Sequence, residues 1–332
     1  MSAKHTRRGF VKGSLAAAAG AMALSVEEQV LLAQQGGAAK GTGEGDGPKR
    51  LLRPGSQAKL PTGKLGKLEI SRLVMGGNLI AGFAHSRDLT YLSSLLKHYF
   101  TPEKILETLA IAEAHGVNAV NTNTGGTEII QRYRKETGSK IAWIVQGYPT
   151  EAGDVTGVKK SIDAGADAIY VQGGVGDRLI ENGKLDVLEK TVALIHENGL
   201  PAGVGGHSLD TIKECEQAGL PVDFYVKTLH TNDYFTARRP DQPASVIHNR
   251  DDNFWCLDPK AVIDFMKSVP KPWVAFKVMA AGAIAPRRAF EHAFGGGADF
   301  VLAGMFDFQI AEDARIANEV LAKLKRDRPW RA

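Results

Sequence analysis

Short apolar runs alternate with amphipathic segments along the chain from Leu60 to its end. Runs of about four to eight apolar residues bounded by glycine are typical of buried β-strands, and apolar residues spaced every third or fourth position predict helices. One helix is expected over 102–115, because Thr101 can cap it and Pro102 suits its first turn. We expect strands at 70–75, 119–123, 140–146, 168–172, 202–206, 224–228, 273–279 and 300–303.

Glycines mark the junctions between these units. A glycine just before a strand is typical of a helix C-terminus, where the chain adopts a left-handed conformation. Eight strand–helix units in succession predict an α/β fold, a single-domain (β/α)₈ (TIM) barrel over 59–332, with its site at the C-terminal strand ends. An open doubly wound sheet is the alternative, but no Gly-x-Gly-x-x-Gly follows the first strand. The junction glycines are Gly116, Gly165, Gly199, Gly219 and Gly297.

Two connections, 76–101 and 229–259, are longer than a simple turn between strand and helix. Loops of that length in a compact domain are usually functional. The aromatic residues Phe254 and Trp255 favour a packed lid in the second loop, and arginines such as Arg238 would suit an anionic or polyhydroxyl ligand.

The first 33 residues have the plan of an export signal. The basic segment Thr6-Arg7-Arg8-Gly9-Phe10-Val11-Lys12 precedes a short run rich in alanine and glycine. The run is too short to span a membrane, which takes about 20 residues. The paired arginines resemble the twin-arginine signal, which implies the twin-arginine export machinery as a partner and a periplasmic or other extracytoplasmic location. Residues 34–58, rich in glycine and charge, are expected to form a flexible linker.

Two predicted strands each carry a lysine near the C-terminal end. Lys227 follows Asp223-Phe-Tyr-Val, and Lys277 follows Trp273-Val-Ala-Phe. Burial disfavours the charged form of lysine and lowers its pKa, which makes the amine nucleophilic near neutral pH. The alternative is that both lysines have a structural role, in which they are ion-paired or reach solvent at the strand ends. The pair therefore indicates Schiff-base chemistry on a carbonyl group.

Other strand ends contribute mainly amides and histidines to the expected mouth of the barrel. Carboxylates are scarce, so no metal site is expected; His207, His230 and Asp307 are the one set that could reach a zinc ion. His207, His230 and Asp307 are instead the acid/base candidates. Candidate substrate-binding residues are Asn78, Asn121, Asn123, Gln146, Gln172, Arg238 and Trp255.

The segments Leu65-Gly-Lys-Leu-Glu-Ile-Ser-Arg-Leu-Val-Met-Gly-Gly77 and Gly116-Val-Asn-Ala-Val-Asn-Thr resemble the opening of aldo-keto reductases. That resemblance implies an NADPH-dependent barrel with an Asp, Tyr, Lys, His tetrad. The tetrad does not carry over, because Asn121, Gly126, Gln146 and Gln172 stand at or near its positions. Loss of the tyrosine removes the usual proton donor.

The sixth and seventh predicted strands are similar to those of Schiff-base aldolases of the deoxyribose-phosphate aldolase type. Val222-Asp-Phe-Tyr-Val-Lys227-Thr matches the strand of their reactive lysine, and Phe276-Lys277-Val-Met-Ala-Ala-Gly matches the strand of the second lysine that perturbs it. The resemblance implies Lys227 as the nucleophile and Lys277 as its electrostatic partner. Tyr170 stands where the family has an aspartate, so Asp307 or His207 would have to replace that group.

Glycine-rich turns after the last two strands suit the corner where such barrels bind phosphate. Gly282, Arg287 and Gly304 are the anion-binding candidates. A formal charge of +4 over 332 residues, part of it in 1–33, indicates no nucleic-acid partner, and no stable membrane span is expected. Cys215 and Cys256 form no disulfide framework, and their pairing stays open.

Together these features predict an exported lyase or aldolase that acts on a small, sugar-derived carbonyl compound without a required cofactor. One alternative is an oxidoreductase related to the aldo-keto reductases, which would bind NADP. Another is a barrel that binds carbohydrate through its amide-rich mouth and catalyses nothing.

Overall fold

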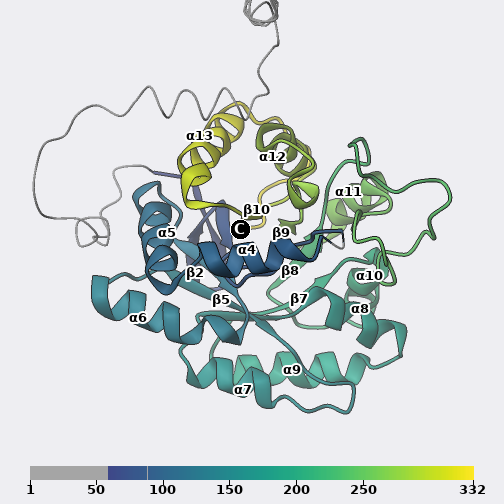
Figure 1. Cartoon of the computed structure of the whole chain (residues 1–332). Helices are drawn as coiled ribbons and strands as arrows, with labels where there is room; N and C mark the ends of the chain where they lie inside the picture. The colour runs from purple at the N-terminus through teal and green to yellow at the C-terminus, as the bar shows by residue number, and fades with distance from the viewer. Residues whose placement is uncertain (1–58, 88) are drawn as a thin grey trace, which may run out of the picture. The chain divides into compact units, whose positions relative to one another are not determined.

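The computed structural model describes residues 59–87 and 89–332. Eight parallel strands form a closed barrel in the order β10, β3, β4, β5, β6, β7, β8, β9, and Figure 1 shows helices ringed around it. The expected (β/α)₈ fold is confirmed, whereas the predicted signal and linker lie outside the described residues. The barrel strands are β3 (Leu73–Gly76), β4 (Ala119–Thr122), β5 (Ala142–Gly147), β6 (Ala168–Val171), β7 (Ala202–Gly206), β8 (Phe224–Thr228), β9 (Trp273–Phe276) and β10 (Phe300–Gly304).

A short hairpin precedes the barrel. The expected strand at 70–75 is divided at Arg72 into the end of β2 (Leu68–Ser71) and the start of β3, and β2 pairs antiparallel with β1 (Thr62–Leu65). At this junction the Arg72 amide donates to the Pro61 oxygen, and the Arg72 oxygen accepts from the Val301 amide of β10. The Arg72 guanidinium donates to the carbonyl oxygens of Asp299 and Ala332. The hairpin buries Leu65 and Ile70 against the barrel's interior residues, so it closes the N-terminal end.

The helices lie mostly where the pattern predicts them, and Thr101 caps its helix by accepting from the Lys104 amide. The exception is α4 (Tyr91–Tyr99), which forms inside the connection expected to be a loop and crosses in front of the barrel in Figure 1. No helix in the described part of the chain is long and apolar enough to span a bilayer. The others are α5 (Pro102–Ala114), α6 (Thr127–Thr137), α7 (Thr156–Asp163), α8 (Gly173–Glu181), α9 (Leu185–Glu197), α10 (Leu209–Gln217), α11 (Pro259–Ser268), α12 (Pro286–Gly295) and α13 (Asp307–Lys323).

Strand side chains alternate between the barrel interior and the layer beneath the helices. On β8, Phe224 and Val226 belong to the interior cluster, whereas Tyr225 packs in the outer core. Because successive side chains of a strand point to opposite faces, Lys227 leaves β8 on the outer face. This alternation decides which of the two lysines reaches the mouth.

Candidate active site

Lys277 lies one residue beyond the end of β9, where the strand gives way to a tight turn. In a continued strand the Lys277 side chain would point toward the helix layer, as that of Lys227 does. The φ of 57° at Lys277 ends the extended conformation and changes this direction. The Lys277 Nζ lies 4.7 Å from the centre of the Trp255 ring. Among the described residues its Nζ has no hydrogen bond and no ion pair, so the amine is partly exposed and unengaged.

The electrostatics of Lys277 favour a neutral amine. Burial lowers the pKa of Lys277 to about 7, although the negative charges of Asp252 and Asp177 act in the opposite direction. About half of the Lys277 side chains are therefore neutral at pH 7. A neutral amine with no protein partner is a competent nucleophile.

Backbone strain is concentrated around this amine. In the described part of the chain, the non-glycine residues with left-handed φ are Arg87, Asp252, Lys277, Ala280 and Ala281. Each such residue costs about 1–3 kcal/mol unless its surroundings hold it in place. Arg87 donates to the Ala280 oxygen, so the strained residues belong to neighbouring segments at the barrel mouth. Strain of this kind is typical of a functional site.

Trp255 is held against Lys277 by contacts between the two long connections. Its indole nitrogen donates to Asp252 Oδ1 at 3.0 Å, and the same carboxylate lies 3.0 Å from His85 Nδ1. The His85 and Trp255 rings are 5.1 Å apart. Phe254 and Trp255 are both buried, as the sequence predicted for a packed lid.

His207 follows the end of β7 and forms a dyad with Asp177 of α8. The His207 Nδ1 lies 2.8 Å from Asp177 Oδ2, and because a carboxylate only accepts, Nδ1 carries the proton. Burial and then the charge of Lys277 lower the pKa of His207 to about 4, although the hydrogen bond that His207 donates to Asp177 acts to raise it. The ring is therefore neutral at pH 7 and has a free lone pair on Nε2, which suits a proton acceptor.

Asp177 is held in turn by surrounding donors. Its carboxylate accepts from the backbone amides of His207 and Ser208 and from the Thr211 hydroxyl. Burial acts to raise the pKa of Asp177, but the bonds and charge of His207 together with Thr211 outweigh it and lower that pKa. Asp177 therefore remains ionised and orients His207.

Lys227 is completely buried, and its amine is fully bonded. Nζ donates to the His207 oxygen at 2.8 Å, to the Thr228 oxygen at 3.1 Å and to Thr228 Oγ1 at 2.8 Å. Burial lowers its pKa, with Cys256 and Asp177 opposing. The acceptors are all neutral, so neither exposure nor ion pairing explains this lysine. Its position is better suited to fixing the end of β7 than to meeting a substrate.

His230 is also buried with both ring nitrogens engaged. Nδ1 faces the Thr231 oxygen at 2.9 Å, and Nε2 accepts from the Trp255 amide at 3.0 Å. Burial lowers the pKa of His230 to about 4. His230 thus positions Trp255, which leaves His207 as the better acid/base candidate of the two.

Two of the expected amides, Asn121 and Gln146, form a connected network with two tyrosines. Asn121 accepts from Gln146 Nε2 at 3.1 Å and from the Tyr170 hydroxyl at 3.2 Å, and donates to the Ile144 oxygen. Gln146 in turn accepts from the Tyr148 hydroxyl. The aldo-keto reductase positions Asn121 and Gln146 are therefore bonded to each other.

The remaining substrate-binding candidates are used locally. Gln172 caps α8 by accepting from the Val175 amide, and Asn123 accepts from the Gly125 amide. Arg238 donates to the Gln242 and Pro243 oxygens of its own loop. Asn78 is exposed. Asn123 also lines a pocket of about 490 Å³, together with Ile80, Phe83, Ile105 and Ile129, but none of the residues around Lys277 lines it.

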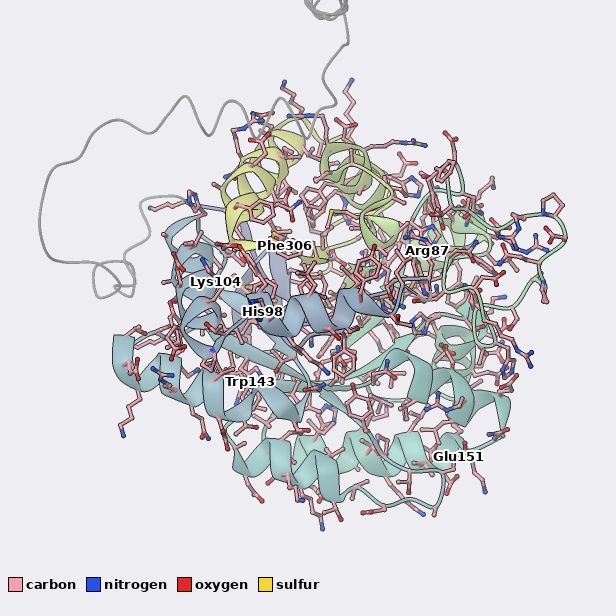
Figure 2. All side chains as sticks on the ribbon, viewed as in Figure 1. Arg87, His98, Lys104, Trp143, Glu151 and Phe306 are labelled. Carbon is pink, nitrogen blue, oxygen red and sulfur yellow. The ribbon has the colours of Figure 1, made fainter. Side chains whose placement is uncertain are left out.

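The structure does not bring Asp307 to the lysine site. Its carboxylate accepts from the Tyr99 hydroxyl at 2.6 Å and lies 3.2 Å from Lys104 Nζ. Figure 2 shows Lys104 and Phe306 toward one end of α4 and Arg87 beyond the other end. Asp307 therefore fastens α13 to α4 and α5.

The residues of the predicted anion-binding site after the last two strands are only partly free to bind a ligand. Arg287 is ion-paired with Glu319, while Gly282, with a φ of 87°, forms the turn after Lys277 and Gly304 ends β10. Within residues 59–87 and 89–332, no three His, Cys, Asp or Glu side chains are grouped to hold a metal ion. Cys215 and Cys256 are separate buried thiols, and burial raises the pKa of Cys215 to about 12.

The sequence did not single out Asp177, Asp252 or His85 as site residues. Asp252 and His85 lie in the long connections, where sequence spacing does not predict which side chains meet. Asp177 had a weak signal, because Gly173, Gly174 and Gly176 before it indicate a helix that closely approaches a strand.

Comparisons with known proteins identify the fold. No protein-family model matches the chain, and no curated protein sequence matches it significantly. A putative aldo-keto reductase from Pseudomonas aeruginosa matches with a TM-score of 0.53 at 17% identity, over 80% of this chain and 98% of that one. FabK from Thermotoga maritima matches with a TM-score of 0.42 at 18% identity, over 72% of this chain and 62% of that one. A 3-hexulose-6-phosphate synthase matches with a TM-score of 0.41 at 16% identity, over 66% of this chain and 94% of that one. The first similarity supports the barrel and no more.

Proposed function

We propose that the protein is an imine-forming enzyme of the lyase or aldolase type that acts on a small carbonyl compound, with Lys277 as the nucleophile. The observation that carries the proposal is the unengaged Lys277 amine, with a pKa of about 7, set in a strained turn beside Trp255. The expected roles of the two lysines are reversed, because the Lys227 amine is enclosed by three acceptors.

The first step is attack of the neutral Lys277 nitrogen on the carbonyl carbon. The new C–N bond pushes the carbonyl π electrons onto oxygen, and the amine proton passes to that oxygen to give a carbinolamine. A proton from solvent then protonates the carbinolamine hydroxyl, which leaves as water with the electrons of the C–O bond. The nitrogen lone pair forms the C=N bond of an iminium ion, which withdraws electrons from the adjacent carbon–carbon bond. His207 Nε2 is the proposed carrier of these protons, oriented by Asp177.

The surroundings of Lys277 suit this sequence. The Trp255 face stabilises the cationic iminium as it stabilises an ammonium ion. At the C-terminal end of β5, the exposed Tyr148 hydroxyl and the Gln146 amide that it bonds offer polar partners for substrate hydroxyl groups. A sugar-derived carbonyl compound is therefore the proposed substrate class.

Borohydride reduction tests the covalent step. Incubation of the wild-type protein with a panel of small aldehydes and ketones, followed by reduction, should add the mass of the reduced substrate at Lys277. Lys277→Met should abolish the adduct, and Lys227→Met, if folded, should retain it. An adduct at Lys227, or none with any carbonyl compound, would contradict the proposal.

We also propose that residues 1–33 direct export by the twin-arginine pathway, on the strength of Arg7, Arg8, Phe10 and Lys12. Replacing Arg7 and Arg8 together with lysine should keep a fused reporter in the cytoplasm. Unchanged export of that double variant would count against the pathway.

A further inference from the structure

Arg87 is a cationic side chain at the barrel mouth with no carboxylate partner among the described residues. Its Nη2 donates to the Ala280 oxygen at 3.2 Å, and its Nε is buried without a hydrogen bond. Lys277 accepts through its own oxygen from the Ala280 amide at 2.9 Å. One turn of backbone therefore connects the guanidinium to the proposed nucleophile.

Other buried polar groups without hydrogen-bond partners lie in or near residues 230–236 of the long second connection. The Thr231 and Thr236 hydroxyls and His292 Nε2 are buried without partners. The charge of Arg87 acts to lower the pKa of Tyr234, and the charge of His292 acts to lower the pKa of His230, so each of these two basic side chains lies near one residue of the segment 230–236. Buried polar groups left without partners cost about 1–3 kcal/mol each, so a ligand that supplied acceptors to these donors would recover part of that cost.

We propose that Arg87 forms a subsite for the carboxylate or phosphate group of the substrate, with the Thr231 and Thr236 hydroxyls as additional donors. The inference rests on the imine chemistry proposed for Lys277 and narrows the substrate to anionic carbonyl compounds. A guanidinium with a free Nε presents donors that match two oxygens of such a group. Figure 2 places Arg87 next to the green loop that precedes α11.

This subsite differs from the corner that the sequence predicted. Arg287 is neutralised by Glu319, and Arg238 donates to carbonyl oxygens of its own loop. Arg87 has only one carbonyl acceptor among the described residues and retains donors for a ligand. A carboxylate next to the reacting carbonyl and a phosphate farther along the chain share this chemistry.

Matched pairs of carbonyl compounds provide the test. Pyruvate is compared with hydroxyacetone, and glycolaldehyde phosphate with glycolaldehyde, in borohydride trapping of the full chain. The concentration for half-maximal adduct should be lower for one anionic member, and Arg87→Gln should raise it about ten- to a hundredfold while leaving the neutral partner unchanged. Pyruvate preference identifies a carboxylate, and glycolaldehyde phosphate preference identifies a phosphate. Arg315→Gln, on the far face of α13, should behave as wild type.

Calorimetry with inorganic phosphate and with oxalate tests the Arg87 subsite separately from the imine chemistry proposed for Lys277. Loss of anion binding in Arg87→Gln supports the subsite even where no imine forms with any carbonyl compound. If the wild type traps the anionic and neutral carbonyl compounds equally and binds no anion, the subsite is contradicted, while the imine chemistry at Lys277 is supported. Loss of anion binding in Arg287→Gln rather than Arg87→Gln would also overturn the subsite. Because Arg87→Gln also removes the bond to Ala280, Arg87→Lys is measured alongside and should retain part of the preference.

Discussion

At the scale of single residues, the burial that lowers the pKa of Lys277 suits the proposed chemistry and also destabilises the fold. The Lys277 pKa of about 7 in the folded chain lies below the value of about 10.4 for an unfolded chain. Between these values the unfolded chain binds more protons, so the free energy of unfolding rises with pH. Below pH 7 both states are protonated, and the cost of burying the charge is present in full.

Lys277→Met should therefore raise the free energy of unfolding most below pH 7, and its advantage should disappear by about pH 10.5. The gain is on the order of 1.4 kcal/mol for each unit of pKa shift, reduced by the partial exposure of the side chain. Urea unfolding at pH 6, 8 and 10 measures it. Lys190→Met, on the exposed surface of α9, serves as the control and should show no such trend. A Lys277→Met advantage independent of pH would contradict a depressed pKa.

Asp252 tunes the same amine from the lid. Its charge raises the pKa of Lys277, and its Oδ1 holds the Trp255 indole. Asp252→Asn keeps an acceptor for the indole but removes the charge, so the midpoint of adduct formation against pH should fall by about one unit. Trapping from pH 5 to 9 measures the midpoint. Asp241→Asn, which changes an exposed carboxylate of the same loop, should leave it in place; a raised midpoint in Asp252→Asn would oppose this role.

The sequence predicted the lysines but not their roles, for a physical reason. A lysine in an apolar strand is visible in the sequence, whereas the face it occupies depends on where the strand ends. Lys227 lies inside β8, opposite Ala275 of β9, whereas Lys277 lies one residue beyond the end of β9 and adopts a left-handed φ. The lid carboxylate Asp252 could not be predicted, because its loop has no periodicity.

At the scale of elements, the contact between β7 and α8 sets the His207–Asp177 pair. A Cβ at Gly176 would lie 2.3 Å from the Gly205 oxygen, closer than any atoms pack, so α8 approaches the strand only because Gly176 lacks a side chain. Asp177 is the next residue along the helix. Gly176, which weakens the helix, is thus explained by the close approach that brings this carboxylate to His207.

Gly176→Ala should force α8 away from β7, lower the free energy of unfolding by about 1–3 kcal/mol and slow adduct formation at Lys277. Chemical unfolding and single-turnover trapping measure the two effects. Gly157→Ala, in α7 with nothing near the added methyl group, is the matched control and should stabilise by about 0.5–1 kcal/mol. Equal stability of the two variants would show that the close contact does not constrain α8.

Prediction of the elements from sequence worked where periodicity was long. The strands at 202–206 and 224–228 were predicted with their observed bounds, since apolar runs ended at turns on both sides. Helix α4 was missed within 76–101, because it buries little more than Leu96 and lacks a side-chain cap. The 229–259 connection was predicted to form a packed lid. Its internal contacts, such as the Gln242–Asn253 amide pair, could not be predicted, because they depend on a loop fold without a repeating pattern.

At the scale of the whole molecule, the two ends of the barrel have different tasks. The mouth gathers strained residues and unengaged polar groups, whereas the N-terminal end is closed by the hairpin and by the C-terminal tail. Trp330 lies between the guanidinium groups of Arg72 and Arg326, at 3.9 and 3.7 Å from its ring centre. In such barrels the mouth carries catalysis and the opposite end carries stability.

Arg328 offers the sharpest test of this division. Its buried guanidinium bonds Asp299 at 2.6 Å and the Met266, Val269 and Lys271 oxygens, so it joins the tail to α11 and the start of β9. Arg328→Ala leaves the Asp299 carboxylate without this partner and should lower the free energy of unfolding by about 3–5 kcal/mol. Well below its melting temperature, however, this variant should still form the Lys277 adduct at the wild-type rate. Lys277→Met should not lower the free energy of unfolding but should form no adduct, because in the proposed function its amine serves chemistry and not packing. If the folded Arg328→Ala protein instead lost the adduct, the two ends would be coupled through the strands, and the mouth could not be treated as an independent site.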